Sequence, residues 1–174
     1  MGAVPYRVMT VCTGNICRSP MAEVVLRERL AAAGLDGEVV VDSSGVSDEE
    51  EGNPIDRRAR AVLREHGYPT ADLHRAHQVT SAELESRDLV LAMTATHARA
   101  LRRLAPTPEA AERVVLYRSF DPAAPEVAPG GPEYLLDIDD PWYGGQREFE
   151  ACLAQVEAAA DGIVDHVRAA LGAD

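Results

Sequence analysis

A short stretch near the N-terminus combines residue types that suit chemistry on an oxyanion. It reads Val11-Cys12-Thr13-Gly14-Asn15-Ile16-Cys17-Arg18-Ser19-Pro20. Cys12 is placed to act as a nucleophile, because helix N-termini and neighbouring arginines stabilise a thiolate. Backbone N–H groups of a tight loop form a nest for anions, and the guanidinium of Arg18 can bind two oxygens at once. These groups together suit a phosphate monoester.

The residues that follow Cys12 are expected to surround the phosphate. This phosphate-binding set is Thr13, Gly14, Asn15, Ile16, Cys17, Arg18 and Ser19. Gly14 lets the backbone turn where a Cβ would crowd the ligand. The Ser19 hydroxyl is placed to stabilise the Cys12 thiolate as a leaving group when a phosphocysteine breaks down.

Protonation of the leaving group requires a second segment. A tyrosine phenolate has a parent pKa of about 10, so its expulsion without a proton is costly. Asp140 precedes a proline, which restricts it to an extended conformation that can hold a carboxyl group over the site. We expect Asp140 to supply the proton, and Asp137 and Asp139 to be solvated loop carboxylates. Trp142 and Tyr143 would flank an aromatic substrate ring.

Short apolar segments alternate with helical segments, which predicts parallel βαβ units covered on both faces. The expected strands span 6–11, 38–41, 89–93 and 114–117. The expected helices span 19–33, 56–66, 81–85, 95–104 and 146–171, with Ser19 as N-cap of the first. Segments 42–54 and 119–142 are expected to be loops. Ligands of such sheets bind beyond the carboxyl ends of the strands, where Cys12 would lie.

Composition narrows the class of protein. The chain has 174 residues and a formal net charge of -12, and we expect one domain over 1–174. The acidity argues against a nucleic-acid partner. No apolar run is long enough to span a membrane and no secretory leader is visible, so we expect a cytoplasmic protein with no membrane partner. Cys12, Cys17 and Cys152 lack the spacing of a zinc site.

Two motifs together resemble the signatures of the low-molecular-weight protein tyrosine phosphatases. They are V-C-T-G-N-I-C-R-S-P near the N-terminus and D-P-W-Y-G-G near the C-terminus, with a matching middle feature, His74-Arg75-Ala76-His77-Gln78. The resemblance covers essentially the whole chain. It implies an α/β fold with a four-stranded parallel sheet in the order 2-1-3-4, flanked by helices on both faces. It also implies an enzyme that uses no metal and no cofactor.

The resemblance implies roles for individual residues. Cys12 would be the nucleophile, Arg18 the phosphate ligand, and Asp140 the general acid and then the base. Cys17 would trap oxidised Cys12 as a reversible disulfide. The polar residues that would hold the loop in shape are Asn15, Ser19, Ser43 and His74.

Three positions depart from the family pattern. Glu49 takes the place of the usual aromatic wall residue, beside Trp142 and Tyr143 as the rest of the expected substrate wall. Thr94 stands where Asp is usual, and His97 stands where Asn is common. An acidic wall would disfavour acidic phosphopeptides and favour basic or small substrates. We assign His97 no catalytic role.

The leading hypothesis is a hydrolase that acts on a phosphotyrosine-containing protein or a small aryl or alkyl phosphate. Inorganic phosphate or a similar oxyanion would then occupy the loop. The alternatives are a protein arginine phosphatase, whose known relatives tend to carry Thr where this chain has Ile16, and a phosphatase of a small phosphorylated metabolite. An arsenate reductase would need two further cysteines between Cys17 and Cys152, and the sequence has none there. A non-catalytic phosphate-binding protein would not need Asp140.

Overall fold

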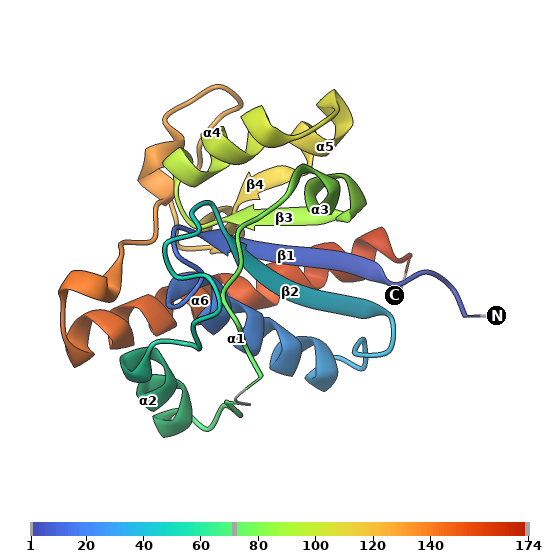
Figure 1. Ribbon diagram of the computed structural model, residues 1–174. Helices are drawn as coiled ribbons and strands as arrows, with labels where there is room; N and C mark the ends of the chain where they lie inside the picture. Colours follow the sequence, from blue (N-terminus) through green and yellow to red (C-terminus); the bar gives the residue numbers. More distant parts are fainter. Residues whose placement is uncertain (1, 71–72, 173–174) are drawn as a thin grey trace.

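A parallel β-sheet forms the centre of the computed structural model, which describes residues 2–70 and 73–172 (Figure 1). The strands in these residues are β1 (Tyr6–Cys12), β2 (Val39–Gly45), β3 (Leu89–Ala92) and β4 (Val114–Leu116). They lie in the order β2-β1-β3-β4, and all three pairings are parallel. The α/β class and the strand order 2-1-3-4 are therefore confirmed.

Helices cover both faces of this sheet. They are α1 (Arg18–Ala32), α2 (Arg57–Glu65), α3 (Ser81–Ser86), α4 (Ala95–Leu104), α5 (Pro108–Glu112) and α6 (Gln146–Ala170). Helices α1, α2 and α6 lie on one face, and α3, α4 and α5 lie on the other (Figure 1). Successive residues of a strand point to opposite faces, so Val8 of β1 joins the core beneath α1 and α6, while Met9 joins the core beneath α4.

The long segment before α6 contains three short 3-10 turns instead of continuous coil. They are η1 (Tyr117–Phe120), η2 (Glu133–Leu136) and η3 (Pro141–Tyr143). Helix η3 begins directly after Asp140, at the proline that the sequence places there. None of the helices in the described residues is long and apolar enough to cross a membrane.

Strand β2 is longer than predicted. The loop was expected to start at residue 42, but the strand continues to Gly45. Ser43 and Ser44 are buried there and lie in register with Thr10 and Val11 of β1. The last residues of β2, Ser43, Ser44 and Gly45, are of types that are typical of loops. For this reason the sequence did not predict the end of the strand, which lies next to the site.

The start of α1 also differs from the prediction. The helix begins at Arg18, and its N-cap residue Cys17 makes no side-chain capping bond. Ser19 is therefore not the N-cap. Its hydroxyl is instead hydrogen-bonded to Cys12, Asn15 and Ser44.

Helix α5 was not predicted. It has only five residues, and Ala110 and Ala111 are too few apolar side chains to give a visible periodicity. Two residues at its start do indicate a helix. Thr107 caps it by accepting from the N–H of Ala110, and Pro108 occupies the first helical position.

Gly45 gives a test of how closely β2 and the loop after β1 are packed. A Cβ at Gly45 would lie 2.6 Å from the carbonyl oxygen of Thr13. We predict that Gly45→Ala lowers the free energy of unfolding by about 1–3 kcal/mol, because a rigid backbone atom has to move. Gly37→Ala is the control, since a Cβ there meets nothing within 4 Å. Urea unfolding measures both, and equal effects of the two substitutions would contradict this account.

Candidate active site

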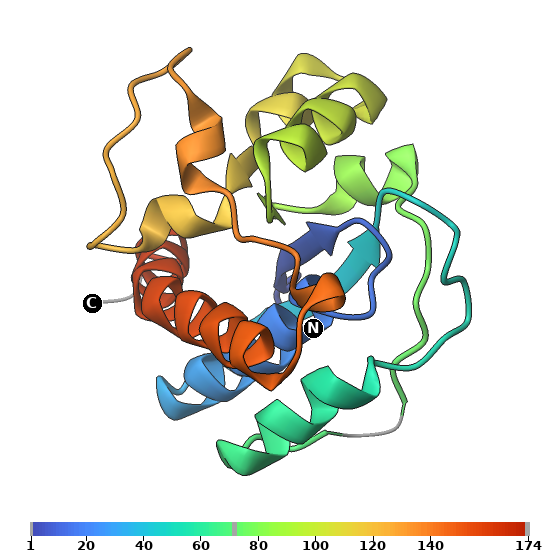
Figure 2. The same cartoon turned by 90° about the vertical axis from the view of Figure 1, so that its left-hand side faces the viewer.

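The loop that follows β1 lies at the carboxyl edge of the sheet, where parallel sheets bind ligands. Figure 2 looks onto this edge, and the blue loop lies between the teal segment after β2 and the orange segment that contains η3. A hollow of about 140 Å³ lies there. Its lining residues are Cys12, Thr13, Gly14, Ile16, Cys17, Arg18, Glu49, Glu50, Asp140, Trp142 and Tyr143. The structure thus brings together the expected nucleophile, arginine and acid from distant parts of the chain.

The shape of the loop depends on Asn15. Asn15 has a φ of 60°, the only left-handed backbone at a non-glycine residue in the described chain. Its amide nitrogen donates to the hydroxyl oxygens of Ser19 and Ser43, each at 2.9 Å. Its amide oxygen accepts from the backbone N–H of His77 at 3.1 Å. An asparagine tolerates this backbone better than most residues, and the bonds of its fully buried amide fix the turn.

His74 supports the same turn from a third segment. Its Nε2 donates to the carbonyl oxygen of Asn15 at 2.8 Å. Burial lowers the pKa of His74, which favours the neutral ring. Because a carbonyl oxygen can only accept, the ring hydrogen lies on Nε2. Asn15, Ser19, Ser43 and His74, which were expected to hold the loop in shape, therefore lie in one hydrogen-bonded network.

The Ser19 hydroxyl lies under the sulfur of Cys12. Its oxygen is 3.0 Å from Cys12 Sγ and 3.2 Å from the carbonyl oxygen of Ser44. A hydroxyl has one hydrogen to donate, and this hydrogen can turn from the Ser44 carbonyl to the sulfur when the sulfur becomes a thiolate. Cys12 itself is buried, with 3% of its surface exposed.

Arg18 connects the loop after β1 with the segment that carries Asp140. It is 4% exposed, and its Nη1 donates to the carbonyl oxygen of Ile138 at 3.0 Å. Its Nη2 lies 3.5 Å from Asp140 Oδ2 and 3.5 Å from Thr13 Oγ1. Its Nε is buried and has no hydrogen-bond partner among the described residues. A guanidinium with unused donors at the floor of a hollow is suited to an anion with several oxygens.

Asp140 is held at the start of η3. Its Oδ1 accepts from the backbone N–H of Trp142 at 3.1 Å, and its backbone is extended, as expected before a proline. The side chain is 38% exposed, so Oδ2 is accessible from the hollow as well as near Arg18.

Asp137 corrects the expectation of a solvated carboxylate. Its Oδ1 accepts from the backbone N–H of Ala95 at 2.7 Å, at the N-terminus of α4. An anion at this end of a helix satisfies a free N–H group and interacts favourably with the helix dipole. Asp139, by contrast, is exposed as expected.

Arg58 of α2 anchors the segment after Asp140, and nothing in its sequence neighbourhood pointed to this role. Its Nη1 donates to the carbonyl oxygens of Trp142 and Gly144 at 2.9 and 3.0 Å. Its guanidinium carbon lies 5.0 Å from the centre of the Trp142 ring and 4.7 Å from that of Phe149. Trp142 is 44% exposed and Tyr143 is 90% exposed, so both rings are available at the mouth of the hollow.

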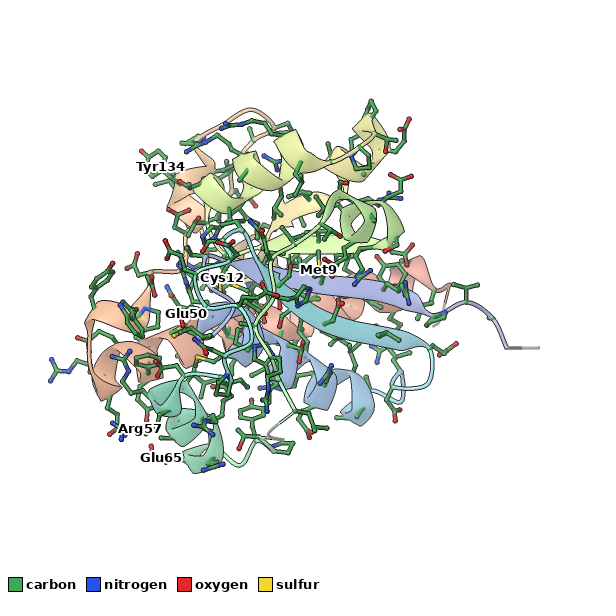
Figure 3. All side chains as sticks on the ribbon, viewed as in Figure 1. Met9, Cys12, Glu50, Arg57, Glu65 and Tyr134 are labelled. Carbon is green, nitrogen blue, oxygen red and sulfur yellow. The ribbon has the colours of Figure 1, made fainter. Side chains whose placement is uncertain are left out.

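The acidic wall contains two glutamates instead of the one expected. Glu50 lines the hollow together with Glu49, and Figure 3 shows Glu50 beside Cys12. A Cβ at Gly14 would lie 3.1 Å from the Cγ of Glu50. The side chain of Glu50 therefore packs directly against the loop after β1, residues 13–17, which we call the phosphate loop. Among the described residues that line the hollow, Arg18 is the only basic one, whereas Glu49, Glu50 and Asp140 are acidic.

Known proteins share both the sequence and the fold. A family model described as low molecular weight phosphotyrosine protein phosphatase matches residues 7–172. The chain belongs to this family. It is 51% identical to a low molecular weight protein-tyrosine-phosphatase of Streptomyces coelicolor over 94% of both chains. It is 45% identical to low molecular weight protein-tyrosine phosphatase A of Mycobacterium tuberculosis over 94% of this chain and 92% of that protein.

Solved structures agree with this assignment. The crystal structure of YfkJ from Bacillus subtilis superposes with a TM-score of 0.84 at 27% identity, over 97% of this chain and 98% of that one. Vibrio vulnificus Wzb, solved in complex with benzylphosphonate, gives a TM-score of 0.75 at 29% identity, over 92% and 98% of the two chains. The predicted family resemblance is therefore confirmed.

The cysteines of this phosphatase are all free thiols in the structure. Burial raises the pKa of the Cys17 thiol, and Asp56 adds to the effect. Burial also raises the pKa of Cys152 to about 12, in keeping with the core position expected for it. The reversible Cys12–Cys17 disulfide stays a prediction. No group of His, Cys, Asp and Glu side chains in residues 2–70 and 73–172 is arranged to hold a metal ion.

His97 is a phosphatase-site neighbour to which no role was assigned from the sequence. Its Nε2 lies 2.8 Å from Thr13 Oγ1, and 4% of its surface is exposed. Its Nδ1 is buried without a hydrogen-bond partner in the part of the chain that the structure describes. Burial, followed by the charge of Arg18, lowers the pKa of His97 to about 4, and Asp140 opposes this shift. The contact joins α4 to the phosphate loop and could not be found from local sequence.

The pKa of His97 predicts how stability depends on pH. In the unfolded chain its pKa is about 6.5, so below that pH the unfolded state binds more protons than the folded state, and folding stability falls as the pH falls. Between about pH 7.5 and about pH 5, His97 should contribute a loss of roughly 1–2 kcal/mol in the free energy of unfolding. Denaturant unfolding of the wild type and of His97→Gln measures this difference. Parallel pH profiles for the two proteins would contradict a neutral, buried His97.

Proposed function

We propose that this member of the family hydrolyses phosphotyrosine in proteins through a phosphocysteine intermediate on Cys12. The observation that carries the proposal is the convergence of three groups on one hollow: the Cys12 sulfur, the buried Arg18 with its unused Nε, and Asp140. The Streptomyces coelicolor and Mycobacterium tuberculosis relatives support the assignment, because both are named as protein-tyrosine phosphatases.

In the first step, the Cys12 thiolate attacks phosphorus, and the bond between phosphorus and the tyrosine oxygen breaks. Arg18 and the backbone N–H groups of the loop bind the equatorial oxygens, which stabilises the charge that they carry in the transition state. Asp140 gives its proton to the departing tyrosine oxygen. The products are tyrosine and a phosphoryl group bonded to Cys12.

In the second step, water attacks the phosphoryl group, and Asp140 accepts a proton from that water. The bond between phosphorus and sulfur breaks, and inorganic phosphate and the Cys12 thiolate are released. The Ser19 hydroxyl, 3.0 Å from the sulfur, can donate its hydrogen to the thiolate as it leaves. The two steps use side chains and backbone N–H groups of the protein, together with one water molecule.

Aromatic substrates fit the exposed rings at the mouth of the hollow. Trp142, Tyr143 and the apolar side chain of Ile16 all line the hollow. Rings of this kind stack on a phenyl ring, which a phosphoserine or a small sugar phosphate lacks. The Wzb neighbour was solved with benzylphosphonate, itself an aromatic phosphonate. We therefore favour phosphotyrosine over a small phosphorylated metabolite. Ile16, where protein arginine phosphatases tend to carry Thr, favours it over phosphoarginine.

The role of Asp140 predicts a dependence on the leaving group. Asp140→Asn should slow hydrolysis of phenyl phosphate by roughly 100-fold or more, since a poor leaving group needs the proton. Hydrolysis of nitrophenyl phosphate should fall far less, because nitrophenolate leaves readily. Asp139→Asn, which changes the exposed neighbour, should leave both rates near those of the wild type. Steady-state rates measure this, and equal losses on the two substrates would refute the acid role.

We also infer that the acidic wall selects phosphotyrosine peptides with basic flanking residues. Glu49 and Glu50 add two negative charges beside a hollow that already holds Asp140. An acidic peptide would meet like charges here, whereas an arginine-containing peptide would meet opposite ones.

Replacement of both wall carboxylates tests this selectivity. Glu49→Gln combined with Glu50→Gln should shift the preference for an arginine-flanked over a glutamate-flanked peptide by roughly three- to tenfold in kcat/KM. The shift should shrink at high salt. Glu109→Gln combined with Glu112→Gln removes the same charge from exposed positions of α5 and should change the preference little. An unchanged preference in the wall variant would show that the wall does not select substrates.

A further inference from the structure

The first turn of α4 contacts both loops of the active site. The N–H of Ala95 binds Asp137 in the segment that leads to Asp140, at 2.7 Å. His97, two residues further along the helix, reaches the phosphate loop through Thr13. The helix therefore joins the phosphate loop to the segment that carries Asp140. The reaction steps above assign no role to its contact with Thr13.

Thr13 Oγ1 lies between two nitrogen atoms. One is Nε2 of His97 at 2.8 Å, and the other is Nη2 of Arg18 at 3.5 Å. Arginine can only donate hydrogen bonds, so Arg18 cannot accept the hydrogen of the Thr13 hydroxyl. The direction of that hydrogen is then decided by which nitrogen of His97 carries the ring proton.

The surroundings of the ring decide its tautomer. Nδ1 of His97 is buried without a partner among the described residues. Buried N–H groups without a partner are rarer in native proteins than buried acceptors without one. We therefore assign the hydrogen of the neutral ring to Nε2, which has a partner, and leave Nδ1 as the bare nitrogen. Burial and the charge of Arg18 keep the ring neutral, with a pKa of about 4. Nε2 then donates to Thr13 Oγ1.

We propose that His97 orients the Thr13 hydroxyl as a hydrogen-bond donor to the phosphoryl group bound in the hollow. With both neighbouring nitrogens acting as donors, the hydroxyl hydrogen is directed away from them. Thr13 lines the hollow and is exposed to it, so the remaining direction is toward the ligand. His97 is a positioning residue, and the Thr13 side chain adds one donor to those of Arg18 and the loop backbone. The inference rests on the proposed function for the identity of its ligand.

Matched substitutions on both sides of the bond test the proposal. Thr13→Val keeps the shape of the side chain and removes the hydroxyl, while Thr13→Ser keeps the hydroxyl. His97→Leu removes the donor, while His97→Gln places an amide nitrogen about where Nε2 lies. The measurements are the dissociation constant of inorganic phosphate by calorimetry, and kcat and KM for nitrophenyl phosphate.

Thr13→Val should weaken phosphate binding roughly tenfold, the typical effect of one hydrogen bond to a charged group. His97→Leu should weaken it several-fold, and Thr13→Ser and His97→Gln should restore most of the affinity. Thr13→Val combined with His97→Leu should bind as Thr13→Val does alone, because both changes remove one interaction.

Wild-type affinity in Thr13→Val would overturn the proposal, as would additive losses in the double variant. Thr13 is exposed, so its two variants remain informative if His97→Leu does not fold. A purely structural role for His97 would alter thermal stability and leave phosphate affinity unchanged. If the wild type binds phosphate but hydrolyses no phosphotyrosine, the proposed function fails while the affinities still decide the role of Thr13.

Discussion

The buried guanidinium of Arg18 is the constraint on which the site depends. A charge that is 4% exposed is costly unless it is paired and hydrogen-bonded. Here the protein provides the carbonyl of Ile138 and, each at the long distance of 3.5 Å, the carboxylate of Asp140 and the hydroxyl of Thr13. Nε is left for a ligand. Ile138 and Asp140 belong to the one segment that leads into η3, so Arg18 holds this segment against the loop, and an anion completes the pairing.

This local arrangement explains how an acidic protein can bind a dianion. The net charge of -12 repels phosphate at long range. At contact distance, the low-polarity surroundings strengthen the field of Arg18, and backbone N–H groups add to it. The loop has to be rigid for these groups to be useful, since donors that reorganise during the reaction give less stabilisation. The left-handed turn at Asn15, fixed by Ser19, Ser43 and His77, supplies that rigidity.

Sequence patterns predicted the elements whose signals are local. An apolar strand just before Cys12 and an aspartate before a proline are features of neighbouring residues, so a parallel sheet and the pairing of Cys12 with Asp140 were accessible. The strand order came from the family resemblance, because local patterns do not specify which strands are neighbours. Ser19 shows the limit of such signals. A serine at this place fits a helix cap as well as a buried hydrogen-bond network, and contacts with Ser44 and Asn15, which no local rule includes, determine the outcome.

The remaining site residues act across long sequence separations. Arg58 holds the turn at Trp142 from α2, His97 reaches Thr13 from α4, and Asp137 caps that same helix. Each is an ordinary polar residue in its own segment, so its role appears only when the strands bring the segments together. Glu50 was missed for a simpler reason: within a run of glutamates, only the packing over Gly14 distinguishes it from its neighbours.

The most direct test of the account is to look for the covalent intermediate. Nitrophenyl phosphate is mixed with the wild-type enzyme, the reaction is quenched with acid within milliseconds, and the digested protein is analysed by mass spectrometry. The account predicts a burst of nitrophenol close to one equivalent per enzyme and a phosphoryl adduct on the peptide that contains Cys12, absent from Cys12→Ser. Turnover without an adduct, or an adduct on another residue, would contradict it.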